Sequence, residues 1–182
     1  ILTTSLLKED GVAGFRDGVG LVKGMIERLW DHVYPKLDPE DNNDPTFRIN
    51  VLKGFDGDGS SADLYKLKQR LREAVLTNSQ QRIGKFSLRD VLIAKGELLP
   101  PAGNEGLAAP QLPTMDLINA AFEDTTTEHL QATQGVIEES VTDLVALDAA
   151  LAAKAGGGVG PDLTDIQGVL GELKGILNTQ LA

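Results

Sequence analysis

Residues 11–52 read GVAGFRDGVGLVKGMIERLWDHVYPKLDPEDNNDPTFRINVL, and this stretch decides the fold. Apolar residues recur three and four positions apart in its first part, which is the period of one face of an α-helix. They are Phe15, Val19, Val22, Ile26, Leu29, Trp30 and Val33. Pro35 ends the pattern because proline lacks an N–H group and clashes with the preceding helical turn. We therefore predict a helix over 12–34.

An acidic turn follows and leads into a second helix. Residues 35–45 are almost all of the types that form turns and cap helices. Asp44 is placed to cap the next helix, and Pro45 suits its first position. The apolar pattern then resumes at Phe47, so a helix is predicted over 46–55.

The same stretch carries a resemblance to a known family. Its pattern W-D-x-V-x-P-x-L-D-P-E-D-x-x-D-P-T-x-R-x-N-x-L resembles the signature of the TssA (ImpA-type) N-terminal region of the bacterial type VI secretion system. The matching residues are Trp30, Asp31, Val33, Pro35, Leu37, Asp38, Pro39, Glu40, Asp41, Asp44, Pro45, Thr46, Arg48, Asn50 and Leu52. The resemblance covers roughly residues 11–96, about half the chain.

The resemblance implies a function that composition alone does not give. It implies a non-enzymatic assembly component in the cytoplasm, with no cofactor. Its expected partners are baseplate, sheath, inner-tube and membrane-complex proteins, docked through several moderate contacts that add by effective concentration. The candidate motif residues, structural or partner-docking, are Trp30, Pro35, Leu37, Asp38, Asp41, Asp44, Pro45 and Arg48.

Composition narrows the possible functions. Of the 182 residues, 41% are hydrophobic and only 4% aromatic, and the formal charge is −10. Few aromatic residues favour helix packing over a β-sandwich, so an all-α helical bundle or hairpin is predicted. The negative charge repels phosphate backbones, so nucleic-acid binding is not expected. The chain has no cysteine, and no apolar run reaches the roughly 20 residues that span a membrane.

The remaining residues suggest two helical regions. Further helices are predicted at 1–9, ended by Asp10-Gly11; at 63–77, capped by Asp63; and at 87–96, where Ser87 and Asp90 resemble a capping box. Three more are predicted at 114–122, at 125–154, opened by a capping box of Thr125 with Glu128, and from Pro161 onward, after a glycine-rich break at 156–160. Residues 99–113 contain four prolines and two glycines and are predicted to be a stiff linker. The expected domains are therefore 1–98, the C-terminal part of the ImpA-type region, and 114–182, a middle helical region. Because the chain starts at Ile1 inside an apolar pattern, we expect a fragment without the start of that region and without the family's C-terminal domain.

The last helix carries a heptad seam. Its apolar residues are spaced 3-4-3-4: Leu163, Ile166, Leu170, Leu173 and Leu177. Such a seam predicts an antiparallel hairpin with 126–154 and makes these five residues candidates for self-association, with a dimer expected.

Glycines in the first helix allow two interpretations. Each costs a helix roughly 1 kcal/mol relative to alanine. Either Gly14, Gly18 and Gly24 let a neighbouring helix approach closely, or tertiary packing simply compensates for a poor helix former.

The acidic turn also permits a metal site, which would suit a metal-dependent hydrolase. Asp38, Glu40, Asn42 and Asp44 alternate as in a calcium loop, but glycine at its sixth position and glutamate at its twelfth are missing. Pairing of Asp38, Asp41 or Asp44 with Arg48 is the favoured interpretation, because a guanidinium binds a carboxylate through two hydrogen bonds.

Other catalytic patterns are missing from the sequence. No G-x-S-x-G elbow and no phosphate-binding loop occur, and His32 has no second histidine near it, so we interpret it as a packed side chain. Besides the hydrolase, a helical oligomerisation module outside secretion is the other alternative function.

Overall fold

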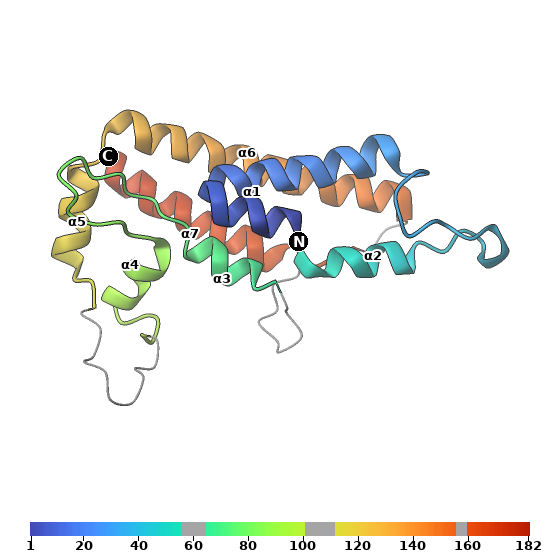
Figure 1. Ribbon diagram of the computed structural model, residues 1–182, viewed down its shortest axis with the longest axis horizontal. Helices are drawn as coiled ribbons and strands as arrows, with labels where there is room; N and C mark the ends of the chain where they lie inside the picture. The colour runs from blue at the N-terminus through green and yellow to red at the C-terminus, as the bar shows by residue number, and fades with distance from the viewer. Residues whose placement is uncertain (56–64, 101–111, 156–159) are drawn as a thin grey trace.

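The computed structural model describes residues 1–55, 65–100, 112–155 and 160–182. Within these residues the only extended pairing is an isolated antiparallel bridge between Val75 and Ser87. The helices are α1 (Leu2–Leu29), η1 (Pro39–Asp41), α2 (Thr46–Leu52), η2 (Lys53–Phe55), α3 (Leu67–Arg72), α4 (Leu88–Ala94), α5 (Met115–Glu123), α6 (Thr127–Ala155) and α7 (Thr164–Leu181). The predicted all-α class is therefore confirmed. Figure 1 shows α1, α6 and α7 lying along the long axis.

Helices α6 and α7 form the predicted antiparallel hairpin. Glu138 near the start of α6 pairs with Lys174 near the end of α7, at 2.8 Å. The Gln134 side-chain amide donates a hydrogen bond to the Asn178 side chain, again joining an early residue of α6 to a late one of α7. Of the predicted break between the two helices, 156–160, residues 156–159 lie outside the described residues.

Helix α1 bends sharply at Gly11. This residue has a φ of +59°, in the left-handed region that glycine enters without steric cost. The predicted end of the first helix at Asp10-Gly11 is therefore confirmed, and residues 2–10 fold back against 12–29 (Figure 1).

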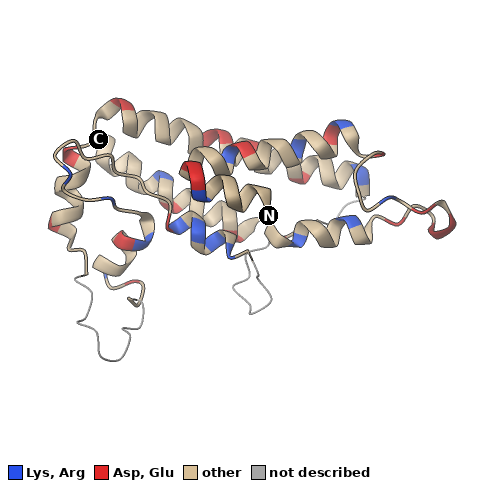
Figure 2. Ribbon diagram, viewed as in Figure 1, with Lys and Arg blue, Asp and Glu red and all other residues tan. Residues whose placement is uncertain are grey.

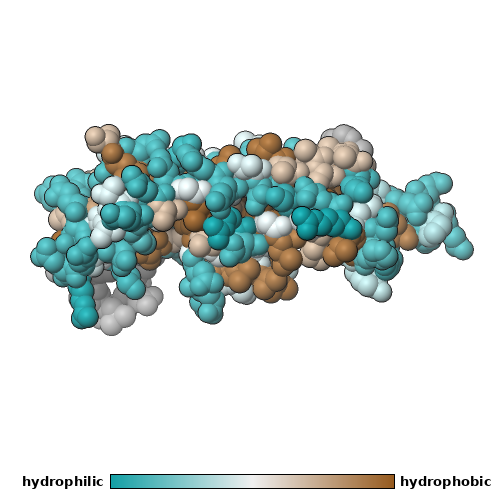
Figure 3. All heavy atoms as spheres, turned by 90° about the horizontal axis from the view of Figure 1, so that it is seen from above, coloured by the Kyte–Doolittle hydropathy of each residue, from teal (hydrophilic) through white to brown (hydrophobic). Residues whose placement is uncertain are grey.

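The second half of α1 runs parallel to α6. Arg16 pairs with Glu139 at 3.0 Å, and Lys23 pairs with Asp143 further along both helices. Figure 3 views the molecule from above and shows mostly hydrophilic side chains on this face, with paler and apolar residues gathered over the second half of α6. Beneath these ion pairs, buried apolar residues of α1 and α6, such as Val19 and Leu144, belong to one hydrophobic cluster.

One hydrophobic cluster unites most of the described chain. Its buried members come from both sides of the stretch 99–113 and include Phe15, Val19, Leu71, Leu88, Phe122, Ile137, Leu144, Ile166 and Leu170. A second cluster joins the end of α1 to α2 and α6 through Ile26, Trp30, Ile49, Leu147 and Leu151. The two predicted regions thus share a core. The boundary between them stays a prediction, since 101–111 lie outside the described residues.

The bounds of α1 and α3 differ from those expected. Helix α1 ends at Leu29 rather than at residue 34, because the chain turns at Trp30 to bury the indole. Helix α3 spans only Leu67–Arg72, and the expected cap Asp63 lies outside the described residues. The capping box of Ser87 with Asp90 is confirmed.

The capping threonine of α6 is also not the expected one. Thr126, not Thr125, accepts the hydrogen bond from the N–H of His129, at 3.2 Å. The hydroxyl of Thr125 is buried and donates to the carbonyl of Ala121 at 2.7 Å. The N–H of Asn78, in a neighbouring loop, also donates a hydrogen bond to the Thr125 hydroxyl. The Thr125 side chain therefore binds this loop instead of capping α6.

Close helix contact explains two of the three glycines. A Cβ on Gly18 would lie 2.7 Å from Cα of Thr3, and one on Gly14 would lie 2.0 Å from the carbonyl oxygen of Leu6. Both distances are far shorter than van der Waals contact, so residues 2–10 pack directly on these glycines. The expectation was wrong for Gly24, where a Cβ would meet nothing within 4 Å.

The two kinds of glycine predict opposite effects on stability. Gly18→Ala is expected to lower the free energy of unfolding by about 1–3 kcal/mol, because the added methyl forces backbone apart. Gly24→Ala is expected to raise it by about 1 kcal/mol, because alanine is the better helix former and the site is open. Urea denaturation followed by circular dichroism measures both. Equal effects at the two sites would contradict the close contact.

Candidate functional site: the acidic turn and its buried arginine

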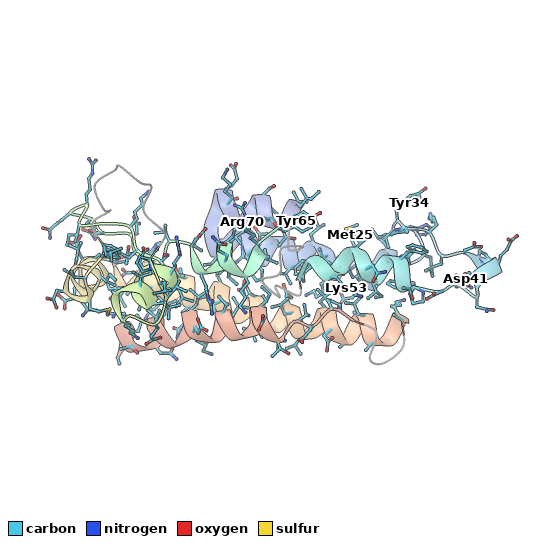
Figure 4. The ribbon with its side chains drawn as sticks, turned by 90° about the horizontal axis from the view of Figure 1, so that it is seen from below. Met25, Tyr34, Asp41, Lys53, Tyr65 and Arg70 are labelled. Atoms are coloured by element: carbon cyan, nitrogen blue, oxygen red, sulfur yellow. The ribbon has the colours of Figure 1, made fainter. Side chains whose placement is uncertain are left out.

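The family motif forms a turn that projects from one end of the helical bundle. It leaves α1 at Leu29, passes through η1 and enters α2 at Thr46. Figure 2 shows acidic residues concentrated at its tip, and Figure 4 places Asp41 there, far from the core. Asp41 and Glu40 are exposed. The turn therefore presents negative charge to solvent.

Arg48 on α2 holds this turn from within. Its side chain is buried, with 3% of the residue exposed. The guanidinium donates to the carbonyl of Trp30 at 2.6 Å, to that of Val33 at 2.8 Å, and to that of Pro35 at 2.7 and 3.0 Å. It also lies 4.5 Å from the centre of the Trp30 ring, a cation–π contact. The Arg48 side chain thus binds the backbone of the turn at three positions.

The expected pairing of Arg48 with an aspartate of the turn is wrong. Arg48 and the three aspartates all lie within the described residues. None of Asp38, Asp41 and Asp44 forms an ion pair with Arg48. Burial lowers the pKa of Arg48, and the negative charge of Asp31 opposes this effect. The predicted structural role is present, but backbone carbonyls supply the acceptors. Carbonyl partners leave no trace in the sequence, because every residue has one.

Two of the motif aspartates cap helices instead. The carboxylate of Asp38 accepts the N–H of Glu40 at 2.9 Å and so caps η1. That of Asp44 accepts the N–H of Thr46 at 3.0 Å and its hydroxyl at 2.7 Å, at the start of α2. The N-cap residue of α2 is Pro45, one position later than predicted, although the Asp44 carboxylate still binds the N–H of the first helical residue. The carboxylates of Asp38 and Asp44 thus accept hydrogen bonds from backbone N–H groups two residues further along the chain.

The apolar members of the motif anchor the turn to the core. Trp30 is buried, and Leu37 packs partly buried against the same cluster. Pro35 contributes its carbonyl to Arg48, and Pro45 immediately precedes α2. Among Asp38, Asp41 and Asp44, only Asp41 has a carboxylate without a hydrogen bond or ion pair in the described part of the chain. It is therefore the motif residue most available to another molecule.

The five seam residues of α7 lie inside the protein. Leu163 is 5% exposed, and Ile166, Leu170, Leu173 and Leu177 are completely buried. They pack within the main hydrophobic cluster, and α7 contacts α3, α4 and α6. A second copy of the chain cannot reach them while the hairpin is folded.

The remaining candidates provide no catalytic arrangement. No group of three or more His, Asp or Glu residues that could hold a metal ion occurs in 1–55, 65–100, 112–155 or 160–182. His32 is exposed rather than packed as expected, because the chain leaves α1 just before it. None of the helices in the described residues is both long and apolar enough to cross a membrane.

The cap at Asp44 makes a testable prediction about pH. Donation by the Thr46 hydroxyl and, second, by the Thr46 N–H lowers the pKa of Asp44 below its ordinary 3.8. A carboxylate with a lowered pKa stabilises the fold fully above its ordinary value, and loses that contribution as pH falls through the lowered value. Thr46→Val should therefore raise the pKa of Asp44, measured by NMR titration of the carboxyl carbon. The pKa of Asp162, lowered by Thr164, is the internal control and should not move.

Comparison with known proteins supports the motif. Residues 1–57 match a family model described as ImpA, N-terminal, type VI secretion system. The type VI secretion system component TssA1 of Pseudomonas aeruginosa is 32% identical over 170 residues, which are 93% of this chain. That alignment covers 45% of TssA1, so the chain spans less than half the length of this relative.

A solved structure shares the fold. It is the N-terminal domain, including the conserved ImpA_N region, of the TssA component of the type VI secretion system from Burkholderia cenocepacia. The TM-score is 0.76 at 20% identity, over 99% of this chain and 68% of the solved one. The resemblance expected from the sequence is thus confirmed: residues 1–57 match the ImpA-type N-terminal family model, and most of the chain is similar to TssA1, a component of a bacterial type VI secretion system.

Proposed function

We propose that this protein is a non-enzymatic assembly component of a type VI secretion system and acts in the cytoplasm. The observation that supports this most is the projecting acidic turn. It lies within the matched residues 1–57, is held rigidly by Arg48, and leaves Glu40 and Asp41 exposed at its tip. A pre-ordered turn loses little conformational entropy on binding, so it suits a docking element.

The proposed partners are the baseplate, sheath, inner-tube and membrane-complex proteins of the same machine. Docking to several of them would be multivalent, with each contact of moderate strength. The acidic tip favours partners with a basic surface, because complementary charge raises the rate of encounter.

A secretion assay in a bacterium that encodes this protein tests the function. Deleting the gene is expected to abolish both release of the inner-tube protein into the medium and formation of fluorescently labelled sheaths. Restoring the unaltered gene should restore both. Undiminished release from the deletion strain would contradict the proposal.

Charge reversal tests the acidic tip itself. Glu40→Lys with Asp41→Lys, in the chromosomal gene, is expected to reduce release at least about tenfold, the effect of losing about 1.4 kcal/mol of binding. Glu123→Lys with Asp148→Lys makes the same charge change at exposed positions on α5 and α6 and should leave release unchanged. Immunoblots must show equal protein levels. Equal loss in both double variants would indicate a net-charge effect instead of docking.

Self-association remains part of the proposal, through surfaces other than the buried seam of α7. Light scattering across a dilution series measures it. A mass twice that of one chain, falling on dilution, would support a dimer. A single-chain mass throughout would contradict self-association, and the secretion assay would still decide the assembly role.

A further inference from the structure

Three sides of helix α1 are covered by the rest of the chain, and one is not. Arg16 pairs with α6 on one side, and residues 2–10 lie on the opposite side as far as Gly18. Val19 enters the hydrophobic core on a third side. The fourth side is exposed or half-buried over 17–28. It is therefore the part of α1 that another molecule can reach.

Five residues share this uncovered side, and we call them the α1 stripe: Asp17, Leu21, Gly24, Met25 and Arg28. Residues three and four positions apart lie on one face of a helix. Leu21 is 47% exposed and Met25 is 38% exposed. Figure 4 shows Met25 on the side of α1 that faces away from α6. A Cβ on Gly24 would meet nothing within 4 Å, so a side chain of another molecule can pack against the backbone there.

The two ends of the α1 stripe carry opposite charges. Asp17 keeps 60% of its side chain exposed, and its ion pair is with the adjacent Arg16, at 2.8 Å. Arg28 is exposed, and its side chain forms no hydrogen bond or ion pair with any described residue. At 1.5 Å per residue, Asp17 and Arg28 lie about 16 Å apart along the helix. The stripe is thus negative at one end, positive at the other, and apolar between them.

We propose that the α1 stripe binds the same stripe of a second copy of this chain, with the two helices antiparallel. A two-fold axis makes every contact twice. Asp17 of each copy then faces Arg28 of the other, and Leu21 of each copy packs on Gly24 of the other. A parallel arrangement would place like charges opposite each other, which repel. The inference rests on the self-association included in the proposed function and names its surface.

The charges of the stripe favour a second copy over a different partner. A partner surface of one sign matches one end of the stripe and is repelled by the other end. A copy of the same stripe, turned end for end, matches both. Because one helix of each copy supplies the contact, the dimer should be weak and transient, with a dissociation constant on the order of 100 μM.

A charge swap followed by sedimentation equilibrium tests the pairing on the full chain. Asp17→Arg alone, or Arg28→Asp alone, turns both attractive charge contacts into repulsive ones and should weaken the dimer at least about tenfold. The variant carrying both changes should recover to within about threefold of the unaltered protein, because the charges are opposite again. An equal mixture of the two single variants should also form dimers, since one chain then has two positive ends and the other two negative ends.

Three results of this experiment would overturn the inference. One is a single-chain mass of the unaltered protein at every concentration up to about 1 mM, well above the expected dissociation constant. The second is a double variant that stays as weak as the single ones. The third is a mixture of single variants that gains no dimer.

A matched pair of variants tests the apolar part of the stripe. Leu21→Glu places a charge in the centre of the proposed contact and should weaken the dimer at least about tenfold. Val145 on α6 is 56% exposed and lies outside the stripe, so Val145→Glu should change the dissociation constant by less than about twofold. Circular dichroism should show equal helix in both variants, since both positions are exposed. A dimer that survives Leu21→Glu would place self-association on another surface.

The secretion assay separates this inference from the assembly role. A deletion strain that releases no inner-tube protein, together with an unaltered protein that stays a single chain, would support the role and overturn the inference. Undiminished release from the deletion strain, together with a dimer that follows the charge swap, would do the reverse.

Discussion

Replacing Leu170 by glutamate is expected to unfold this protein. The side chain of Leu170 is completely buried in the main hydrophobic cluster. A carboxylate there would lose its hydration without gaining a partner, at an expected cost of at least about 5 kcal/mol. Small domains have only about 5–15 kcal/mol of stability in total. Far-ultraviolet circular dichroism should show loss of helix, and the purified variant should aggregate.

The neighbouring position on α7 provides the control. Gly171 is exposed, and a Cβ there would meet nothing within 4 Å. Gly171→Glu should leave the helical signal and the melting temperature nearly unchanged, or raise the latter slightly, since glutamate is the better helix former. A folded, monomeric Leu170→Glu protein would show that the seam serves self-association instead of the core of a single chain.

Replacing Arg48 by methionine should have the second largest effect. The variant keeps much of the buried volume but leaves the carbonyls of Trp30, Val33 and Pro35 without their donor. Losing charge-assisted bonds and leaving buried acceptors unpaired should lower the free energy of unfolding by about 3–4 kcal/mol. Guanidinium denaturation measures this loss. Limited proteolysis should also cut within 31–45 faster, because the turn is no longer fixed.

Two further variants serve as comparisons for Arg48→Met. Arg48→Lys retains the charge but lacks the planar fork, so it should recover only part of the stability. Lys53→Met, at an exposed position just after α2, should change the free energy of unfolding by less than about 0.5 kcal/mol. If Arg48→Met were as stable as Lys53→Met, the four hydrogen bonds of the guanidinium would not hold the turn.

Local patterns were predicted well because their causes lie within a few residues. The capping box of Ser87 with Asp90 and the bond from Thr46 to Asp44 each join residues no more than three positions apart. The bend at Gly11 is equally local. The period of the α7 seam also predicted its hairpin with α6, since an apolar stripe must be covered by something.

Predictions that required knowing the partner were wrong or remained open. Thr125 was expected to cap α6, but Asn78, distant in sequence, engages its hydroxyl. Arg48 was expected to bind an aspartate, but backbone carbonyls accept its hydrogen bonds. The close-contact interpretation is correct for Gly14 and Gly18, which pack against residues 2–10. Gly24 is also a glycine within the helix, but it has open space beside it.

The sequence by itself determined the helical class, the order of the helices and the resemblance of residues 11–52 to the ImpA-type region, because periodicity, caps and motif spacing are properties of neighbouring residues. Only the tertiary structure decided which surfaces are free. It buried the α7 seam in the chain's own core and turned Arg48 inward onto three backbone carbonyls. The physical reason is that the sequence specifies the chemistry of each side chain, whereas its contact partner depends on the packing of residues that are far apart along the chain.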